Sequence, residues 1–161
     1  MVQVLDRKIV EKAVREYSDN LLKIAYTYTK NRSDAEDIVQ DAFLSLMIEE
    51  KEFMSQEHMK AWLIRVTINK SKNHIKSAWV SKQTKMPEEL EHLSEEENEL
   101  LDAVFLLEEK YRIPIHLFYY EGYTITEIAE IMGKNPATIG SWLDRGRKRL
   151  KKQLGDELFE R

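Results

Sequence analysis

The chain has 161 residues and a formal net charge of −4, and 42% of its residues are hydrophobic, enough for one ordinary domain or two small ones. With 5 Gly and 3 Pro against 34% charged residues, the composition favours helices, so we predict an all-α chain. The absence of cysteine excludes disulfides, cysteine-ligated zinc and a thiol nucleophile. The first residues lack the core of a signal peptide and the most apolar run, 103–107, is too short to span a bilayer, so we expect a cytoplasmic protein.

The first predicted elements form a small helical domain at residues 1–80. Apolar residues recur at helical spacing in residues 14–30 and again in residues 56–79. Between these two segments, Ser33 and Glu36 have the spacing of a capping box, which predicts that a helix begins there. The apolar stripe of this helix consists of Ala35, Ile38, Val39, Ala42, Phe43, Leu46 and Met47.

Charge is distributed in two opposed blocks in the middle of the chain. Lys and Arg are the only charged residues from 58 to 87, whereas Asp and Glu are the only ones from 88 to 109. Pro87 and the polar residues around it break the helical pattern, so we predict an acidic linker at residues 81–93. Charge runs are typical of solvated helix faces and flexible spacers, and both interpretations stay open here.

A second small helical domain is predicted at residues 94–161. Ser94 and Glu97 have the spacing of a capping box, which predicts that the first helix of this domain begins there. Pro114 suits the first turn of the next helix because its missing N–H has no helical partner at that position, and Gly122 suits the end of that helix.

Residues 124–152 have the pattern of a helix-turn-helix. Thr124 and Glu127 open a short helix as a capping box, Gly133 ends it, and Asn135 caps a longer helix that starts with a proline. The longer helix has a basic end and a buried seam of Ile139, Leu143 and Leu150. In a DNA-binding helix-turn-helix, the second helix enters the major groove. The same pattern also fits a helical hairpin that does not bind DNA.

No catalytic, cofactor or metal site is predicted from the sequence. Neither a glycine-rich phosphate loop nor a nucleophile elbow is present. The four histidines are not spaced as metal ligands are; they are His58, His74, His92 and His116. We therefore expect a protein that is not an enzyme, needs no cofactor and has no small-molecule substrate.

Nearly the whole chain resembles the small two-domain sigma factors of bacterial RNA polymerase, the extracytoplasmic-function (ECF) group of the sigma-70 family. Three stretches carry the resemblance in order: "RSDAEDIVQDAFLSL" at 32–46, "KAWLIRVTINKSKNHIK" at 60–76 and "YYEGYTITEIAEIMGKNPATIGSWLDRGRKRLKK" at 119–152. The resemblance implies that the first domain binds core polymerase and the −10 promoter element, and that the second reads the −35 element. The partners it implies are the beta-prime clamp helices and beta flap of core RNA polymerase, promoter DNA, and an anti-sigma factor that can hold the protein at the membrane.

Within the first domain, the resemblance assigns roles to individual residues. Asp37, Gln40 and Asp41 match the polar positions of the helix that docks on the clamp helices. Asn69 matches an asparagine near the pocket for a flipped-out base of the −10 element. The other residues expected at that element are Phe53, Lys60, Arg65, Lys70, Lys72 and Lys76. Trp62 is expected in the core, and base stacking is its alternative role.

In the second domain the chain departs from the family pattern. The family often has a run like T-V-K-S-R-L-x-R-A-R, whereas this chain has "TIGSWLDRGR". Gly140, Trp142 and Asp144 therefore stand where basic residues are common. The residues expected at the −35 element are Thr138, Gly140, Ser141, Trp142, Arg145 and Lys148.

The predicted function is that of a sigma factor that directs promoter-specific initiation. Two alternatives belong to other classes: a stand-alone helix-turn-helix regulator and an adaptor that binds only protein. A regulator would bind duplex DNA by itself, usually as a dimer, and an adaptor would bind the polymerase without directing new initiation.

Overall fold

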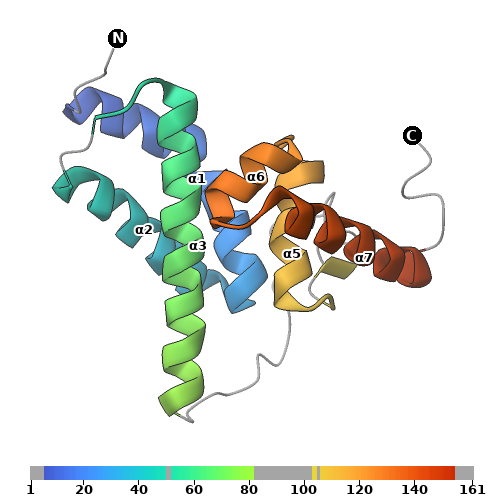
Figure 1. Cartoon of the computed structure of the whole chain (residues 1–161). Helices are drawn as coiled ribbons and strands as arrows, with labels where there is room; N and C mark the ends of the chain where they lie inside the picture. Colours follow the sequence, from blue (N-terminus) through green and yellow to red (C-terminus); the bar gives the residue numbers. More distant parts are fainter. Residues whose placement is uncertain (1–5, 50–51, 82–102, 105, 155–161) are drawn as a thin grey trace. The chain divides into compact units, whose positions relative to one another are not determined.

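The computed structural model describes residues 6–49, 52–81, 103–104 and 106–154, and every labelled element among them is a helix (Figure 1). The all-α prediction is therefore confirmed. The chain divides into two compact units, Met1–Glu91 and His92–Arg161. This division falls inside the range 81–93 that was predicted as the linker, although residues 82–93 themselves lie outside the described part of the chain.

The first unit is a bundle of three helices that all pack on one another. They are α1 (Arg7–Thr29), α2 (Arg32–Ile48) and α3 (Gln56–Ser81). Each helix contributes fully buried side chains, and complete burial of one such side chain contributes about 1.5–3 kcal/mol. The core includes Leu21, Ile24 and Tyr26 from α1, Ala35, Ala42 and Leu46 from α2, and Met59, Leu63 and Ile64 from α3.

The start of α2 differs from the predicted capping box at Ser33. The helix is capped by Asn31, whose side chain accepts a hydrogen bond from the amide of Asp34. Glu36 instead makes an ion pair with Arg32, with 2.9 Å between Oε1 and Nε. The physical reason lies in the preceding turn: α1 ends at Lys30 in the left-handed conformation, and Asn31 follows in extended conformation, which is the backbone geometry of an N-cap.

The apolar stripe of α2 is buried as predicted except at its end. Met47 was predicted to lie inside the stripe, but 60% of it is exposed. Leu46 is fully buried in the same turn. Since neighbouring helical residues point about 100° apart, the turn that buries Leu46 directs Met47 outward.

The second unit contains α5 (Glu109–Ile115), the π-helical turn η2 (His116–Tyr120), α6 (Ile125–Met132) and α7 (Pro136–Leu154). Pro114 was predicted in the first turn of a helix, but it is the sixth residue of α5. Proline interrupts the hydrogen-bond ladder of an α-helix, and the chain passes into the wider π turn directly after α5. The capping box predicted at Ser94 lies outside the described residues.

The helix-turn-helix of the second unit is confirmed down to its caps. Thr124 and Glu127 form a reciprocal capping box. The Glu127 amide donates to Thr124 Oγ1 at 3.2 Å, and the Thr124 amide donates to Glu127 Oε1 at 2.9 Å. Gly133 ends α6 in the left-handed conformation, with φ of 65°. The side chain of Asn135 then accepts a hydrogen bond from the amide of Ala137 at the start of α7.

The orientation of α7 is set by a buried seam of Ile139, Leu143, Gly146 and Leu150. Gly146 is a close-packing point, because a Cβ atom there would lie 2.9 Å from Ile115 Cγ1 and 3.5 Å from Tyr111 Cβ. Gly140 lies in the same helix, and a Cβ atom there would meet nothing within 4 Å. The packing of the unit therefore requires glycine at position 146 but not at position 140.

The two glycines of α7 give a matched prediction for stability. Both Gly140→Ala and Gly146→Ala gain the higher helix propensity of alanine, which is about 1 kcal/mol. Gly146→Ala alone adds an overpacked methyl group against Ile115, a kind of change that costs about 1–3 kcal/mol. In denaturant unfolding, Gly140→Ala should therefore be the more stable variant by that margin. Equal stability of the two variants would contradict this packing.

Candidate polymerase and nucleic-acid interfaces

One exposed face of α2 carries all three residues that were predicted to dock on core polymerase. Asp37, Gln40 and Asp41 are exposed, and their spacing of three and one places them on one side of the helix. The structure therefore brings this predicted group together. None of the three side chains belongs to the core of the bundle, so the face is open to a partner.

The same face of α2 continues into exposed apolar residues that sequence reasoning missed. Leu44, Met47 and Ile48 are 47%, 60% and 76% exposed. They follow Asp37, Gln40 and Asp41 at the helical spacing of three or four residues. The helical spacing of these residues can be read from the sequence. Apolar residues are expected to be buried, however, so the spacing alone does not predict an exposed apolar face. The α2 docking face is defined here as Asp37, Gln40, Asp41, Leu44, Met47 and Ile48.

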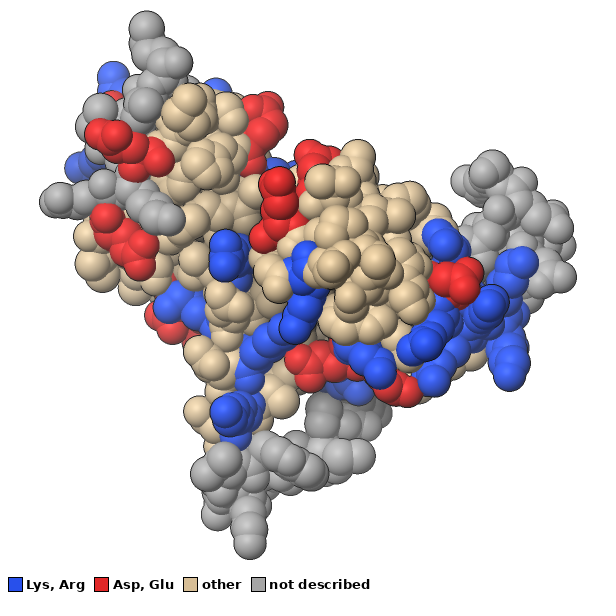
Figure 2. Space-filling model, viewed as in Figure 1, with Lys and Arg blue, Asp and Glu red and all other residues tan. Residues whose placement is uncertain are grey.

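A face of α3 carries four of the seven residues that were predicted at the −10 element. Arg65, Asn69, Lys72 and Lys76 follow one another at spacings of four, three and four, which places them along one side of a helix. Arg65, Asn69 and Lys76 are exposed, and Lys72 is partly exposed. Figure 2 shows Lys and Arg side chains at intervals along α3. We call these four residues the α3 basic face.

Lys60 and Lys70 lie off the α3 basic face. Helical geometry places Lys60 on the opposite side of α3 from Lys76. There its Nζ atom lies 5.9 Å from the centre of the Tyr17 ring, on α1. Burial, with smaller contributions from Glu16 and Glu57, raises the pKa of Tyr17. Lys60 therefore lies beside α1, away from the other predicted −10 residues of α3.

Phe53, which was predicted to line the −10 pocket, is completely buried in the first unit. Its ring makes edge contacts with the rings of His58 and Trp62, at centroid distances of 5.4 and 5.7 Å. His58 in turn accepts a hydrogen bond from the amide of Met54. A ring with no exposed surface cannot contact DNA in this conformation. Phe53 therefore anchors the segment that leads into α3, and Trp62 lies half-buried at the edge of the core.

The residues predicted at the −35 element all lie on the surface of α7. Ser141, Arg145 and Lys148 are exposed, whereas Thr138, Gly140 and Trp142 are partly exposed beside the buried seam. Lys148 is paired with Asp144 one turn earlier, with 3.1 Å between Nζ and Oδ2. Part of its charge is therefore neutralised within the helix.

Two other basic residues of α7 are also held by the second unit itself. Arg149 lies 2.6 Å from Glu108 and 5.0 Å from the centre of the Tyr111 ring. Arg147 donates a hydrogen bond to the hydroxyl of Tyr119, at 3.2 Å. These contacts join the end of α7 to the start of α5 and to η2. The charge of α7 thus contributes to the packing of the unit.

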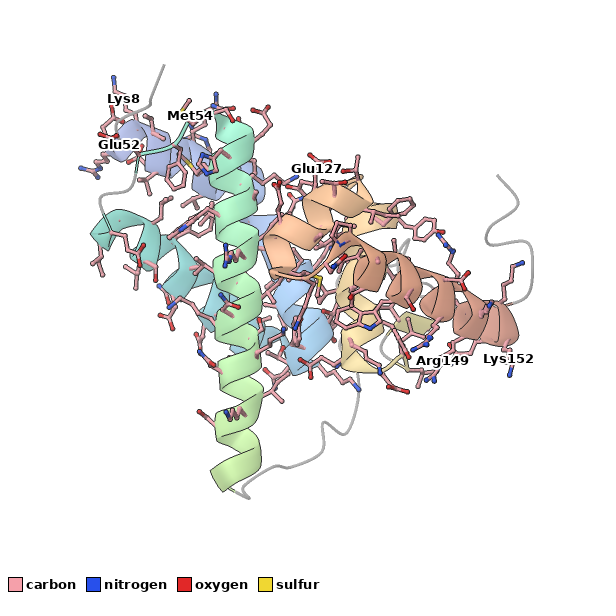
Figure 3. The ribbon with its side chains drawn as sticks, viewed as in Figure 1. Lys8, Glu52, Met54, Glu127, Arg149 and Lys152 are labelled. Carbon is pink, nitrogen blue, oxygen red and sulfur yellow. The ribbon has the colours of Figure 1, made fainter. Side chains whose placement is uncertain are left out.

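Three basic residues of α7 have no such contact with any residue that the structure describes; they are Arg145, Lys151 and Lys152. Figure 2 shows Lys and Arg gathered along α7, and Figure 3 shows Arg149 and Lys152 in its last turns. The cations of α7 therefore divide into a group held within the unit and a group available to an anionic ligand.

The described residues hold neither a cluster suited to a metal ion nor a helix suited to a membrane. Among them, no cluster of three or more His, Cys, Asp or Glu side chains is arranged to hold a metal ion. No helix within the described ranges has the length and apolar character needed to cross a membrane.

Comparison with known proteins assigns both units to one family. Residues 13–80 match Sigma-70 region 2, and residues 97–150 match Sigma-70, region 4. The chain is 27% identical to RNA polymerase sigma factor SigV of Bacillus subtilis, over 89% of this chain and 90% of that protein. It is 26% identical to ECF RNA polymerase sigma factor SigW of the same organism, over 87% of this chain and 86% of that protein.

Solved structures show the same fold. The sigma factor RpoE of Bartonella quintana, crystallised with the anti-sigma factor NepR, matches with a TM-score of 0.77 at 22% identity, over 94% of this chain and 98% of that one. CnrH, solved with the cytosolic domain of CnrY, matches with a TM-score of 0.70 at 20% identity, over 92% of this chain and 89% of that one. The two region matches and the curated relatives place the chain in the sigma-70 family of RNA polymerase sigma factors, in its ECF group.

Arg149 and Lys152 give opposite predictions although both are basic residues at the end of α7. Arg149→Ala should lower the free energy of unfolding by about 1 kcal/mol, because it removes an ion pair and a cation–π contact that are both partly exposed. Lys152→Ala should change that free energy by less than about 0.5 kcal/mol. Lys152→Ala should also weaken DNA binding by the polymerase complex equally on all promoters. It should reduce by about 1 the slope of the logarithm of the binding constant against the logarithm of salt concentration. Denaturant unfolding measures the change in stability, and salt titration of DNA binding measures the change in affinity. A stability loss in Lys152→Ala without one in Arg149→Ala would contradict the assignment.

Asn69 is predicted to act in strand opening because it lies between cations on the α3 basic face. An amide can donate to and accept from one base edge at once. Asn69→Ala should therefore leave closed-complex formation nearly unchanged while reducing permanganate reactivity of the −10 thymines. Asn73→Ala, an exposed asparagine one turn further along α3, is the matched control. Full reactivity in Asn69→Ala would count against the pocket.

Proposed function

We propose that this sigma factor docks on core RNA polymerase through α2, holds the opened −10 element along α3 and reads the −35 element with α7. The observation that carries this proposal is the ordered match to regions 2 and 4, combined with an exposed face on each of these three helices. It is an initiation factor without chemistry of its own. Binding alone, at three surfaces, accounts for its action.

The α2 docking face has two kinds of residue that suit a helical partner. Asp37 and Asp41 offer exposed carboxylates to basic side chains of the clamp helices, and such pairs contribute orientation and association rate more than raw affinity. Leu44, Met47 and Ile48 offer apolar surface for burial, which supplies the larger part of affinity at most interfaces. The beta flap is the partner that we assign to the second unit.

The α3 basic face is suited to a separated DNA strand. Arg65, Lys72 and Lys76 supply positive charge along one side of the helix, and such charge tracks a phosphate backbone with strong salt dependence. Asn69 lies among them and offers hydrogen bonds to a base edge. Phe53 is buried before the start of α3 and packs on Trp62 of that helix.

An anti-sigma factor belongs to the proposed set of partners. Two structural relatives were solved with such regulators or with a cytosolic domain of a second protein. Because it acts on RNA polymerase and promoter DNA, we place the protein in the cytoplasm. A membrane-bound anti-sigma factor would hold it at the membrane until its release.

The charge of the whole chain favours action within the polymerase over action as a separate regulator. The net charge of −4 opposes approach of DNA at long range, although α7 attracts phosphates locally. At physiological salt the Debye length is about 8 Å, so the basic end of α7 acts mainly at contact. Tethering on the polymerase makes each DNA contact effectively intramolecular, which supplies the affinity that the free chain lacks.

Reconstitution with core polymerase on a promoter library tests this function. Initiation that depends on the added protein and on promoter sequence is the expected result. A gel shift with the protein alone separates the alternative: tight, sequence-specific binding of duplex DNA by the free chain would favour a stand-alone regulator. Polymerase binding without new initiation would favour an adaptor.

Charge reversal on the α2 docking face is predicted to reduce binding to core polymerase. The variant Asp37→Lys with Asp41→Lys removes two exposed carboxylates and should change the free energy of unfolding little, as surface substitutions typically do, by about 0.5 kcal/mol each. Asp19→Lys, at an exposed aspartate on α1, is the matched control. Pull-down of core polymerase should fall for the double variant and persist for the control. Equal capture by both proteins would refute the docking assignment.

A further inference from the structure

The first two turns of α7 have no charged side chain. Residues 136–143 read "PATIGSWL", and the positive charges of the helix begin at Arg145, in its third turn. In a helix-turn-helix, the N-terminal residues of the second helix contact base edges. Under the proposed function, this helix reads the −35 element. Residues 136–143 must then select base edges without any charged side chain; we call their exposed side the reading surface of α7.

The first two turns of α7 lack Arg and Lys, the side chains that most often recognise guanine. Guanine is read most often by Arg or Lys, through two hydrogen bonds to its O6 and N7 atoms. The side chain of Asn135, which could otherwise read adenine, is occupied as the cap of α7 by the amide of Ala137. Lys134 is exposed, but it lies in the turn before the helix rather than within its first turns.

The groups that this surface does present suit thymine. Ala137 and Ser141 are exposed one turn apart, with Thr138 and Trp142 partly exposed at the same spacing beside them. Methyl groups of Ala and Thr make apolar contact with the C5-methyl of thymine, and hydroxyl groups bond to either kind of base pair. The seam of Ile139 and Leu143 is buried and cannot turn outward.

Gly140 adds a second observation on the same turns. A Cβ atom there would meet nothing within 4 Å, so no packing within the unit requires a glycine at this position. Glycine inside a helix costs about 1 kcal/mol relative to alanine. A side chain missing from the reading surface lets the backbone of α7 approach the groove closely, and it also removes a site from which Lys could reach a guanine.

We infer that the first two turns of α7 read thymine methyl groups of an A·T-rich −35 element rather than guanine edges. This inference rests on the proposed function, because it concerns the DNA sequence that α7 selects within the polymerase complex. In it, Thr138 and Ala137 contact the methyl groups, while Arg145, Lys151 and Lys152 contact phosphates.

The test uses the full chain bound to core polymerase and a promoter library with a randomised −35 region. We expect selected promoters to have A·T pairs where the first turns of α7 bind. Replacing one such thymine with uracil removes only the methyl group and should weaken binding about fourfold, the fold-change that corresponds to burial of one methyl group. Thr138→Ser should reduce this discrimination, whereas Lys134→Ala should weaken binding to both DNAs equally. Gly140→Lys should shift the selection toward guanine.

The outcomes separate the inference from the proposed function. Initiation from promoters with a guanine-dominated −35 region, or equal binding to the thymine and uracil forms, would overturn methyl readout and leave the sigma-factor function intact. Failure of the protein to direct initiation from any member of the library would overturn the proposed function and the inference with it.

Discussion

The structure of the second unit depends on the burial of one side of α7. Ile139, Leu143, Gly146 and Leu150 form a continuous seam, and the missing side chain of Gly146 lets the helix lie against Ile115. This contact fixes the rotation of α7 about its own axis, because turning the helix would expose three large apolar side chains and bury polar ones. That rotation decides which residues of α7 are exposed to solvent.

An acidic protein can contain a basic helix because the charges of this helix serve two purposes. Arg149 lies between Glu108 and the ring of Tyr111, so its charge helps to hold α7 on α5. Arg145 and Lys152 have no ion-pair partner within the described residues and remain available for phosphates. Individual exposed ion pairs are weak. These ion pairs matter because they hold some cations of α7 within the unit and leave the others available to a ligand.

In the first unit, α2 and α3 each have one buried face and one exposed face. Leu63 and Ile64 hold α3 in the bundle, which leaves Arg65 and Asn69 on the side that meets solvent. On α2, the buried stripe leaves outward a face that starts with carboxylates and ends in apolar side chains. In the proposed docking, the polar part of that face would orient a partner helix and the apolar part would be buried against it, a combination that a purely charged surface could not provide.

The sequence by itself determined the features that depend on near neighbours. The capping box of Thr124 and Glu127 and the helix stop at Gly133 follow from local chemistry, and the residues that match the sigma-70 regions were recognisable from their order along the chain. The tertiary structure alone decided that Phe53 is buried and that Met47 is exposed. Burial depends on which helices cover a residue, and those helices come from distant parts of the chain, so local spacing cannot specify it.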